Sequence, residues 1–260
     1  MEQFTSKLSF EVVDENSVIR KVIDVSSCNG LIDWNRVKGN VDGVIIRCAF
    51  GNDCTSQDDK QFKRNLSECE RLGIPVAGVY IYSYALTIEE AHSEAAHVLR
   101  LLNGKKVPVF IDMEDADNYK RNHGLNPYAN RQLLTNIAIT FLKDMQVAGF
   151  TAKQSGVYAN YDWFKNCLDY QTLKEYGLIW LAQWCQNKSI DNVKCWQYSS
   201  NGTVPGINGR VDMNLWYGSW ISFEPEIEIK KEISCDHLAE IEKLKEVKQE
   251  IEEILKNLEK

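Results

Sequence analysis

Two acidic residues at alternate positions follow an apolar run in the middle of the chain. The run Phe110–Ile111 precedes Asp112, Met113 and Glu114. If this segment is a strand, the alternation of side chains places Asp112 and Glu114 on the same face. Two such carboxylates repel each other, so the pKa of at least one is expected to be raised, as a general acid requires. Exposed carboxylates at a strand end, or a Mg²⁺ or Ca²⁺ site, are the alternatives.

Two further aspartates lie in strand-like segments that are far apart in the chain. Asp24 lies within 22–26, and Asp212 lies within 207–215. Strand interiors disfavour aspartate, and a buried charge is costly unless it is used or paired. The first and last strands of a closed barrel are neighbours, so both side chains can reach the mouth that holds the first pair. This convergence predicts an active site, while a helix-capping or loop-bracing role is the alternative for Asp24 alone.

Strand-like runs alternate with amphipathic stretches, a pattern typical of βα units and a largely parallel sheet. Thr87 and Glu90 form a capping box that begins a helix ending near 103–104. The other predicted helical segments are 34–38, 58–72, 128–148 and 163–168, and a long polar loop is expected over 115–127. The predicted strands are 22–26, 44–49, 75–84, 107–113, 156–160, 178–184, 194–199 and 207–215. The fold class that follows is α/β, an irregular (β/α) barrel of eight strands with fewer helices.

The charge of the chain is concentrated at its C-terminal end. The net charge is −7, and residues 224–260 carry −5 of it. The remaining body has no basic field that would attract nucleic acid or an anionic membrane. We expect an N-terminal extension over 1–21, a catalytic barrel over 22–220, a charged linker over 221–234 and an amphipathic helix over 235–260. This helix contains a short heptad pattern. Three interpretations stay open: the helix packs on the barrel, it is a solvated tail, or it mediates self-association.

The cysteines and histidines do not show the spacing of a metal site. The eight cysteines include no CxxC pair, so we expect no metal and no cofactor. Cys185 and Cys195 flank a polar stretch between two strand-like runs, so they are either a disulfide across a hairpin or two reduced thiols. No run is apolar and long enough to span a bilayer. The first 21 residues lack the apolar core of a signal peptide, so we expect a cytoplasmic protein until its release.

The order of the motifs resembles that of the glycoside hydrolase family 25 lysozymes, the Chalaropsis-type muramidases. The matching segments run from about residue 22 to 216. They are DVS at 24–26, NG at 29–30, IDW at 32–34, IIRCAFG at 45–51, GIPVAGVYIYSYA at 73–85, PVFIDMED at 108–115, GVYAN at 156–160, IWLAQW at 179–184, WQYSS at 196–200 and GINGRVDMN at 206–214. The chain departs from the family pattern at Asn29, Cys48 and Ile81, but it retains all four acidic residues.

The resemblance implies hydrolysis of the β-1,4 bond between N-acetylmuramic acid and N-acetylglucosamine in the glycan strands of peptidoglycan. Glu114 is the implied general acid/base, with Asp24, Asp112 and Asp212 as its acidic companions. Two mechanisms stay open. One is an inverting displacement, and the other, slightly favoured, is participation by the substrate acetamido group with Asp112 as its orienting residue. The residues expected to line the saccharide groove or to pack in the core are Arg47, Tyr80, Tyr82, Tyr158, Gln183, Trp184 and Trp196.

Three other classes of protein share parts of this pattern. A non-catalytic glycan-binding barrel would keep the aromatic residues but not the acids. A metal-dependent hydrolase or nuclease would need histidine ligands or a basic groove, and the four histidines lie outside the strand-end motifs. A chitinase-like glycosidase would use the same chemistry on another glycan. Without a signal peptide, we expect a phage or prophage endolysin that acts on the bacterial cell wall. A module of a phage particle and a bacterial enzyme exported by another route are the alternatives.

Overall fold

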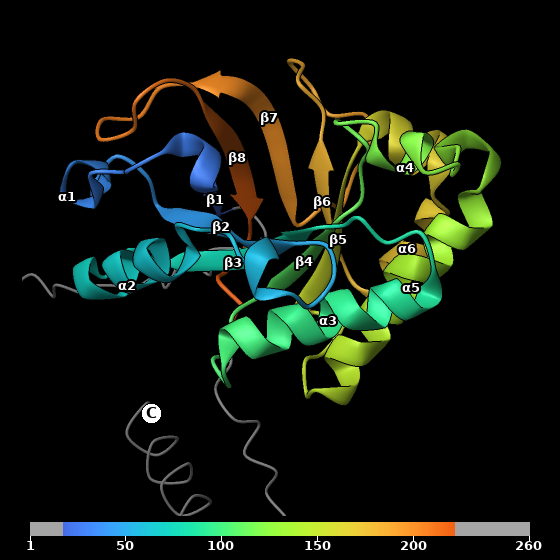
Figure 1. The fold of residues 1–260 in the computed structure, drawn as a ribbon. Coiled ribbons are helices and arrows are strands. Elements are labelled where there is room, and N and C mark those ends of the chain that lie inside the picture. Colours follow the sequence, from blue (N-terminus) through green and yellow to red (C-terminus); the bar gives the residue numbers. More distant parts are fainter. Residues whose placement is uncertain (1–17, 222–260) are drawn as a thin grey trace, which may run out of the picture. The chain divides into compact units, whose positions relative to one another are not determined.

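The computed structural model describes residues 18–221, which form a closed barrel of eight strands in sequence order (Figure 1). The strands are β1 (Ile19–Val25), β2 (Gly43–Phe50), β3 (Val76–Tyr82), β4 (Val109–Asp112), β5 (Ser155–Asn160), β6 (Leu178–Ala182), β7 (Cys195–Gly202) and β8 (Val211–Tyr217). Neighbouring strands from β1 to β7 are parallel. The predicted eight-stranded barrel is confirmed, and the sheet is largely parallel as expected.

The direction of β8 is the exception, because it runs antiparallel to both β7 and β1. The connection from β7 to β8 is short and contains no helix, which suits antiparallel neighbours. The start of β8 therefore lies at the same end of the barrel as the ends of the parallel strands. As a result, Asp212, the second residue of β8, stands in register with Asp24 near the end of β1.

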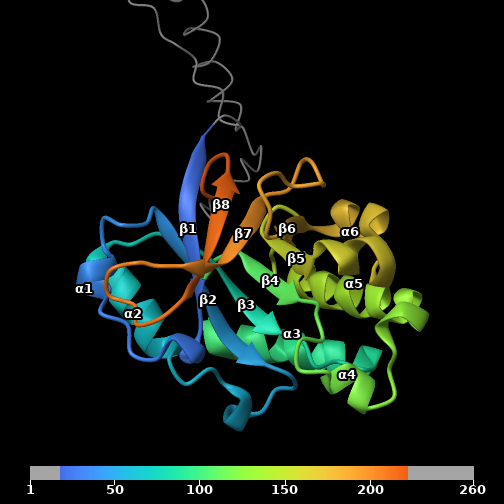
Figure 2. The same cartoon turned by 90° about the horizontal axis from the view of Figure 1, so that it is seen from above.

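Helices cover only part of the barrel. The helices are α1 (Trp34–Val37), α2 (Phe62–Leu72), α3 (Ile88–Leu102), α4 (Tyr119–Asn122), α5 (Arg131–Val147) and α6 (Tyr170–Tyr176), with a π-helical turn η5 (Trp163–Cys167) before α6. Viewed from above, no helix of the described chain lies alongside β8 (Figure 2). The predicted capping box is confirmed, since the Thr87 side chain accepts from the backbone N–H of Glu90 and the Glu90 side chain from that of Thr87.

Two of the helical predictions need correction. The expected loop over 115–127 contains α4, whose start is fixed by Asp115, because that carboxylate accepts the backbone N–H groups of Lys120 and Arg121. The helix expected over 128–148 begins only at Arg131, since the preceding residues form a separate 3₁₀ turn, η4 (Pro127–Ala129). The short helix α6 was not predicted, because Leu173 is its single buried residue and leaves no apolar period.

The interior of the barrel has an apolar floor with a polar layer above it. The floor includes Val22, Ile45, Phe110, Tyr158, Trp180, Cys195 and Trp216. Side chains alternate along a strand, so the next inward-facing positions lie two residues nearer the mouth. From β1, β2, β4, β7 and β8 these positions are Asp24, Arg47, Asp112, Gln197 and Asn214. The strand period that builds the core therefore also places the polar residues directly above it.

The direction of β7 also bears on whether Cys185 and Cys195 form a disulfide. Both are free thiols. The hairpin that a disulfide would need does not form, because β6 and β7 are parallel. Cys195 is in register with Trp180 in the floor of the barrel, whereas Cys185 lies beyond the C-terminal end of β6 and is exposed.

The terminal segments of the expected domain organisation lie mostly outside the described residues. This applies to the N-terminal extension over 1–21, apart from the residues that begin β1, and to the linker over 221–234 and the helix over 235–260. Between residues 18 and 221, no helix combines the length and the apolar character needed to cross a bilayer.

Candidate active site

The four acidic residues singled out from the sequence lie together at the mouth of the barrel. Asp112 is the last residue of β4, and Glu114 follows it in the β4–α4 loop. Asp24 and Asp212 face each other across the β1–β8 pair. The charges of Asp212 and Glu114 act on Asp24, and those of Glu114 and Asp24 act on Asp112. Three distant segments therefore build one acidic cluster.

The pKa values of both Asp112 and Glu114 are raised. Burial raises the pKa of Glu114 to about 7, while a hydrogen bond with Asp112 and the charge of Lys120 oppose that rise. Burial and the charge of Glu114 raise the pKa of Asp112 well above its usual range. The Oδ1 atom of Asp112 is buried and has no hydrogen-bond partner within the described protein. Glu114 is therefore suited to donate a proton, and Asp112 has an oxygen available for a donor on a ligand.

Asp24 is held in one orientation by two amide side chains. Its Oδ2 atom accepts from Nδ2 of Asn214 at 2.8 Å and from Nε2 of Gln197 at 3.0 Å. Burial and the charge of Asp212 raise the pKa of Asp24 to about 7, and the two amide donors lower it. Asn214 is itself fixed, because its Oδ1 accepts from the indole N–H of Trp180 at 2.8 Å. A carboxylate held in this way is preorganised for one task.

Neither amide residue is among those predicted from the sequence, although a signal was available. Gln197 follows Trp196 in the WQYSS motif, and Asn214 lies two residues after Asp212 in the last strand. Strand alternation places Asn214 on the same face as Asp212, which was enough to suggest a polar partner. Gln197 required knowledge of which face of β7 points inward.

Three of the predicted substrate-contacting residues surround the acidic cluster. The hydroxyl of Tyr158 donates to Oε1 of Gln197 at 3.2 Å. Burial and the charge of Asp24 raise the pKa of Tyr80. Nε of Arg47 lies 2.9 Å from Oδ2 of Asp59, so a buried aspartate that the sequence analysis missed orients this guanidinium.

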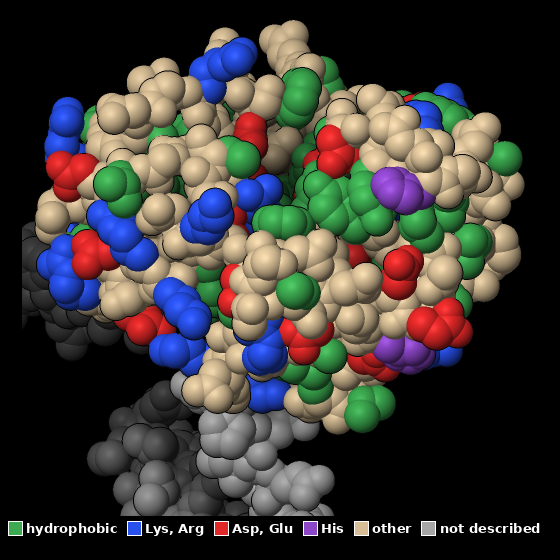
Figure 3. Space-filling model, viewed as in Figure 1, with side chains coloured by type: hydrophobic (Ala, Val, Ile, Leu, Met, Phe, Trp, Pro, Cys, Tyr) green, Lys and Arg blue, Asp and Glu red, His purple; other side chains and the backbone are tan. Residues whose placement is uncertain are grey.

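A groove of about 420 Å³ opens next to the cluster, and it is lined by Arg47, Phe50, Tyr82, Tyr84, Ala116 and Asp117. The hydroxyl of Tyr84 donates to Asp117 at 2.7 Å, and that of Tyr82 donates to the same carboxylate at 3.4 Å. Aromatic rings with polar edges suit sugar rings. The space-filling view shows a hollow with acidic side chains on both sides of it (Figure 3). Of these residues, only Arg47 and Tyr82 were predicted from the sequence.

Of the remaining three predicted residues, Gln183 and Trp184 begin the β6–β7 loop, and Trp196 lies at the start of β7. The side chain of Gln183 is engaged twice with Ser189, as donor to its hydroxyl and acceptor from its backbone N–H, both at 2.8 Å. Trp196 is buried on the face of β7 opposite to Gln197, and its indole donates to the carbonyl of Gln183. We therefore expect Gln183 and Trp196 to support the loop. Trp184 differs, because it is 63% exposed while its indole donates to Gln197 at 3.0 Å.

Metal-ligating side chains do not gather at this mouth in the way a metal site requires. Among residues 18–221, no group of three or more His, Cys, Asp or Glu side chains is arranged to hold an ion. The four carboxyls, the two amides and the aromatic groove instead form a site suited to proton transfer on a polar ligand.

Known proteins resemble this chain in sequence or in structure. Lysozyme M1 from Streptomyces globisporus is 23% identical over 210 residues, which cover 76% of this chain and 67% of that protein. The modular autolysin LytC from Streptococcus pneumoniae, solved with a synthetic peptidoglycan ligand, matches with a TM-score of 0.67 and 29% identity over 76% of this chain and 47% of LytC. The chain thus spans about half the length of LytC.

A third protein supports the fold alone. The bacterial lysozyme from Streptomyces coelicolor matches with a TM-score of 0.65 and 21% identity, over 76% of this chain and 92% of that protein. Residues 23–207, from β1 to the β7–β8 connection, match the glycosyl hydrolases family 25. That match covers more than two thirds of the chain, and the chain therefore belongs to glycosyl hydrolases family 25.

Proposed function

We propose that this protein is a lysozyme that hydrolyses the β-1,4 bond between N-acetylmuramic acid and N-acetylglucosamine in peptidoglycan. The observation that carries the proposal is the position of Glu114, a buried carboxyl with a pKa raised to about 7, beside three further carboxyls and an aromatic groove. Membership of family 25, the likeness to Lysozyme M1 and the peptidoglycan ligand of LytC support this choice of substrate.

In the proposed reaction, Glu114 donates its proton to the glycosidic oxygen as the bond from C1 of N-acetylmuramic acid to that oxygen breaks. The acetamido oxygen of the same sugar attacks C1 and forms an oxazolinium ion. The ionised Glu114 then takes a proton from a water molecule, whose oxygen attacks C1 and reopens the ring. Asp112 accepts the acetamido N–H and orients the group for attack.

The contact between Asp112 and Glu114 favours this mechanism. An inverting pair stands far enough apart to leave room for a water molecule, about 6.5–9.5 Å. The side chains of Asp112 and Glu114 act directly on each other's pKa, and only Met113 separates them in the chain, so we place them closer together than an inverting pair. Participation by the acetamido group retains the β configuration at C1. The first product seen by ¹H NMR should be the β anomer, and an α anomer would indicate inversion with Asp24 or Asp212 as the base.

The decisive experiment is digestion of purified peptidoglycan, followed by reduction and mass analysis of the new chain ends. Reduced muramic acid at the ends supports the proposal, while reduced glucosamine at the ends overturns it. Faster release of soluble fragments from chitin than from bacterial walls would favour a chitinase-like glycosidase. Binding to walls without new ends would favour a glycan-binding barrel. A strong loss of activity with EDTA would favour a metal-dependent hydrolase.

The biological setting is also part of the proposal. We propose that the protein acts on the bacterial cell wall after release from the cell that makes it, as a phage or prophage endolysin. All eight strands lie between Ile19 and Tyr217, so deletion of 225–260 should spare cleavage of soluble glycan strands. Light scattering of the full chain and of this deletion tests self-association through 235–260, since only the full chain should exceed the monomer mass.

A further inference from the structure

Lys120 is a fully buried lysine directly behind the proposed catalytic pair. It lies on α4, and its Nζ donates to the carbonyl oxygen of Glu114 at 3.0 Å and to that of Ser83 at the end of β3. Burial of an ammonium group is costly unless the charge is hydrogen-bonded and used. A neutral side chain would fill the same space with a smaller desolvation penalty. We therefore expect the charge itself to have a function.

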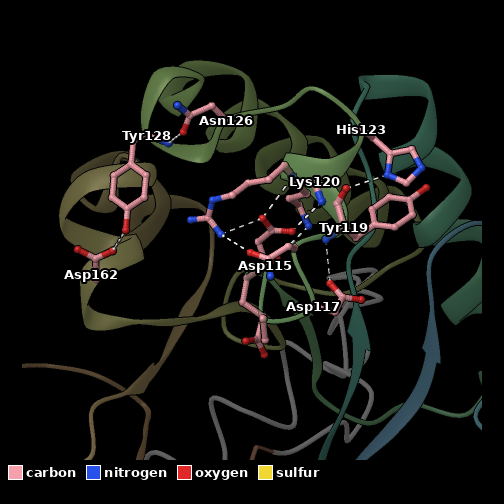
Figure 4. Close-up of polar contacts among 12 residues, drawn as sticks. Asp115, Asp117, Tyr119, Lys120, His123, Asn126, Tyr128 and Asp162 are labelled. Carbon is pink, nitrogen blue, oxygen red and sulfur yellow. Dashed lines mark hydrogen bonds and ion pairs between the residues drawn. The ribbon is translucent and has the colours of Figure 1, made fainter.

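The acids around Lys120 come from three separate segments, and the ring of Trp163 in η5 also lies near its Nζ. The acids are Glu94 of α3, Asp112 of β4, and Asp115 and Asp117 of the β4–α4 loop. Figure 4 shows Asp115 and Asp117 beside Lys120, with Asp115 accepting the backbone N–H of Lys120 at 2.7 Å. Glu94 is fully buried, and its Oε1 accepts the backbone N–H groups of Tyr84 and Ala85.

No single carboxylate neutralises the ammonium group by direct contact. Within the described chain, the hydrogen bonds of Nζ go to carbonyl oxygens, and no ion pair joins it to an acid within 4.0 Å. The positive charge therefore acts through space on several buried acids at once. In a site shielded from water, such a charge acts over a longer distance than at the surface.

We infer that Lys120 is a positioning residue that holds the backbone of Glu114 and sets the pH range in which the Asp112–Glu114 pair works. This inference rests on the proposed function of Glu114. A fixed cation favours the ionised carboxylates and so counteracts burial. The other charged groups that act on the pair are Asp24, Asp117, Asp212 and Arg47, and Lys120 offsets the acids among them.

The first test is the pH dependence of kcat/KM for Lys120→Met, which keeps the length of the side chain but removes its charge. Without the cation, both carboxyls hold their protons to higher pH. Both limbs of the profile should move upward by roughly one pH unit. Arg121→Met is the matched control, because it removes the same charge from the next residue of α4, where the side chain is exposed and paired with Asp115. Its profile should not move.

A second variant separates the charge effect from folding. Lys120→Met leaves the buried Glu94 without a cation and can lower stability. The double variant Lys120→Met with Glu94→Gln removes both buried charges, so it should fold and still show the upward shift. Glu94→Gln alone keeps the cation and should not move the profile upward.

A third measurement does not depend on activity. In full-length protein with ¹³C-labelled glutamate carboxyls, the Glu114 signal is the one lost in Glu114→Gln. Its titration midpoint should rise in Lys120→Met and in the double variant, and it should stay near the wild-type value in Lys120→Arg. An unmoved midpoint in a folded variant without the lysine charge, or an equal rise in Arg121→Met, overturns the inference. Lack of muramidase activity in the wild type would overturn only the proposed function.

Discussion

Asp24 and Asp212 stand directly opposite each other across the antiparallel β1–β8 pair, although 187 residues separate them in the sequence. Like charges at directly opposite positions destabilise a pair of strands, and here the charge of Asp212 raises the pKa of Asp24. Their surroundings differ, since Asp24 is buried and held by two amides, while Asp212 is partly exposed. We therefore expect Asp24 to have a fixed structural and electrostatic role and Asp212 to face the substrate.

Replacement of Glu114 by glutamine should remove the proton donor but keep the shape of the side chain. General acids contribute about 10²–10⁴-fold to a reaction, so the rate of release of new reducing ends should fall at least a hundredfold. Circular dichroism and the unfolding temperature should remain those of a folded barrel. Glu89→Gln, an exposed site on α3, is the control and should retain full activity. More than about one hundredth of the wild-type rate in Glu114→Gln would exclude Glu114 as the acid.

Activity should fall as the pH rises above neutral. Glu114 donates its proton only when protonated, and burial raises its pKa to about 7. The basic limb of kcat/KM for a soluble glycan should therefore have its midpoint near pH 7 in the free enzyme. A profile that stays flat to pH 9 would contradict the assignment.

The stability of the folded protein should fall as the pH rises through neutral, because the pKa of a buried carboxyl is raised in the folded state. The pKa of Asp24 is 3.8 in its ordinary state and about 7 in the folded protein, so the folded state binds the proton more tightly. The contribution of the Asp24 carboxyl to the free energy of unfolding is complete below pH 4, and it is lost as the pH rises through 7. Asp24→Asn should be more stable than wild type at pH 8 by roughly 1–4 kcal/mol and no more stable at pH 4, as measured by urea unfolding. A lower stability at pH 8 would contradict this account.

Replacement of Trp184 should weaken substrate binding without affecting the fold. The side chain is 63% exposed, so Trp184→Ala should leave the unfolding temperature unchanged. Loss of an aromatic face for a sugar should raise KM roughly tenfold, about 1.4 kcal/mol. Trp184→Phe loses the indole N–H that donates to Gln197 but keeps an aromatic ring. Because the ring is retained, its KM should stay close to that of the wild type. An unchanged KM in Trp184→Ala would show that this residue does not contact the glycan.

Local patterns in the sequence predicted much of the fold because they depend on neighbouring residues. The positions of all eight strands and the capping box of Thr87 and Glu90 were correct to within a few residues. Strand β8 was placed about three residues too early, over 207–215 instead of Val211–Tyr217. Helix α4 was missed because its start depends on hydrogen bonds to Asp115 and not on an apolar period.

The place of the four acids on the inward face of strands, or just beyond a strand end, follows from the order of residues in the chain, since the alternation of side chains along β4 and β8 is a local property. The direction of β8 against its neighbours, which brings Asp212 into register with Asp24, depends instead on how the barrel closes. Closure of the barrel also decided that Gln197 and Asn214 hold Asp24, and that Lys120 is buried behind Glu114. These contacts join residues from separate elements, and their geometry follows from how the strands and helices pack and not from the neighbours of each residue in the chain.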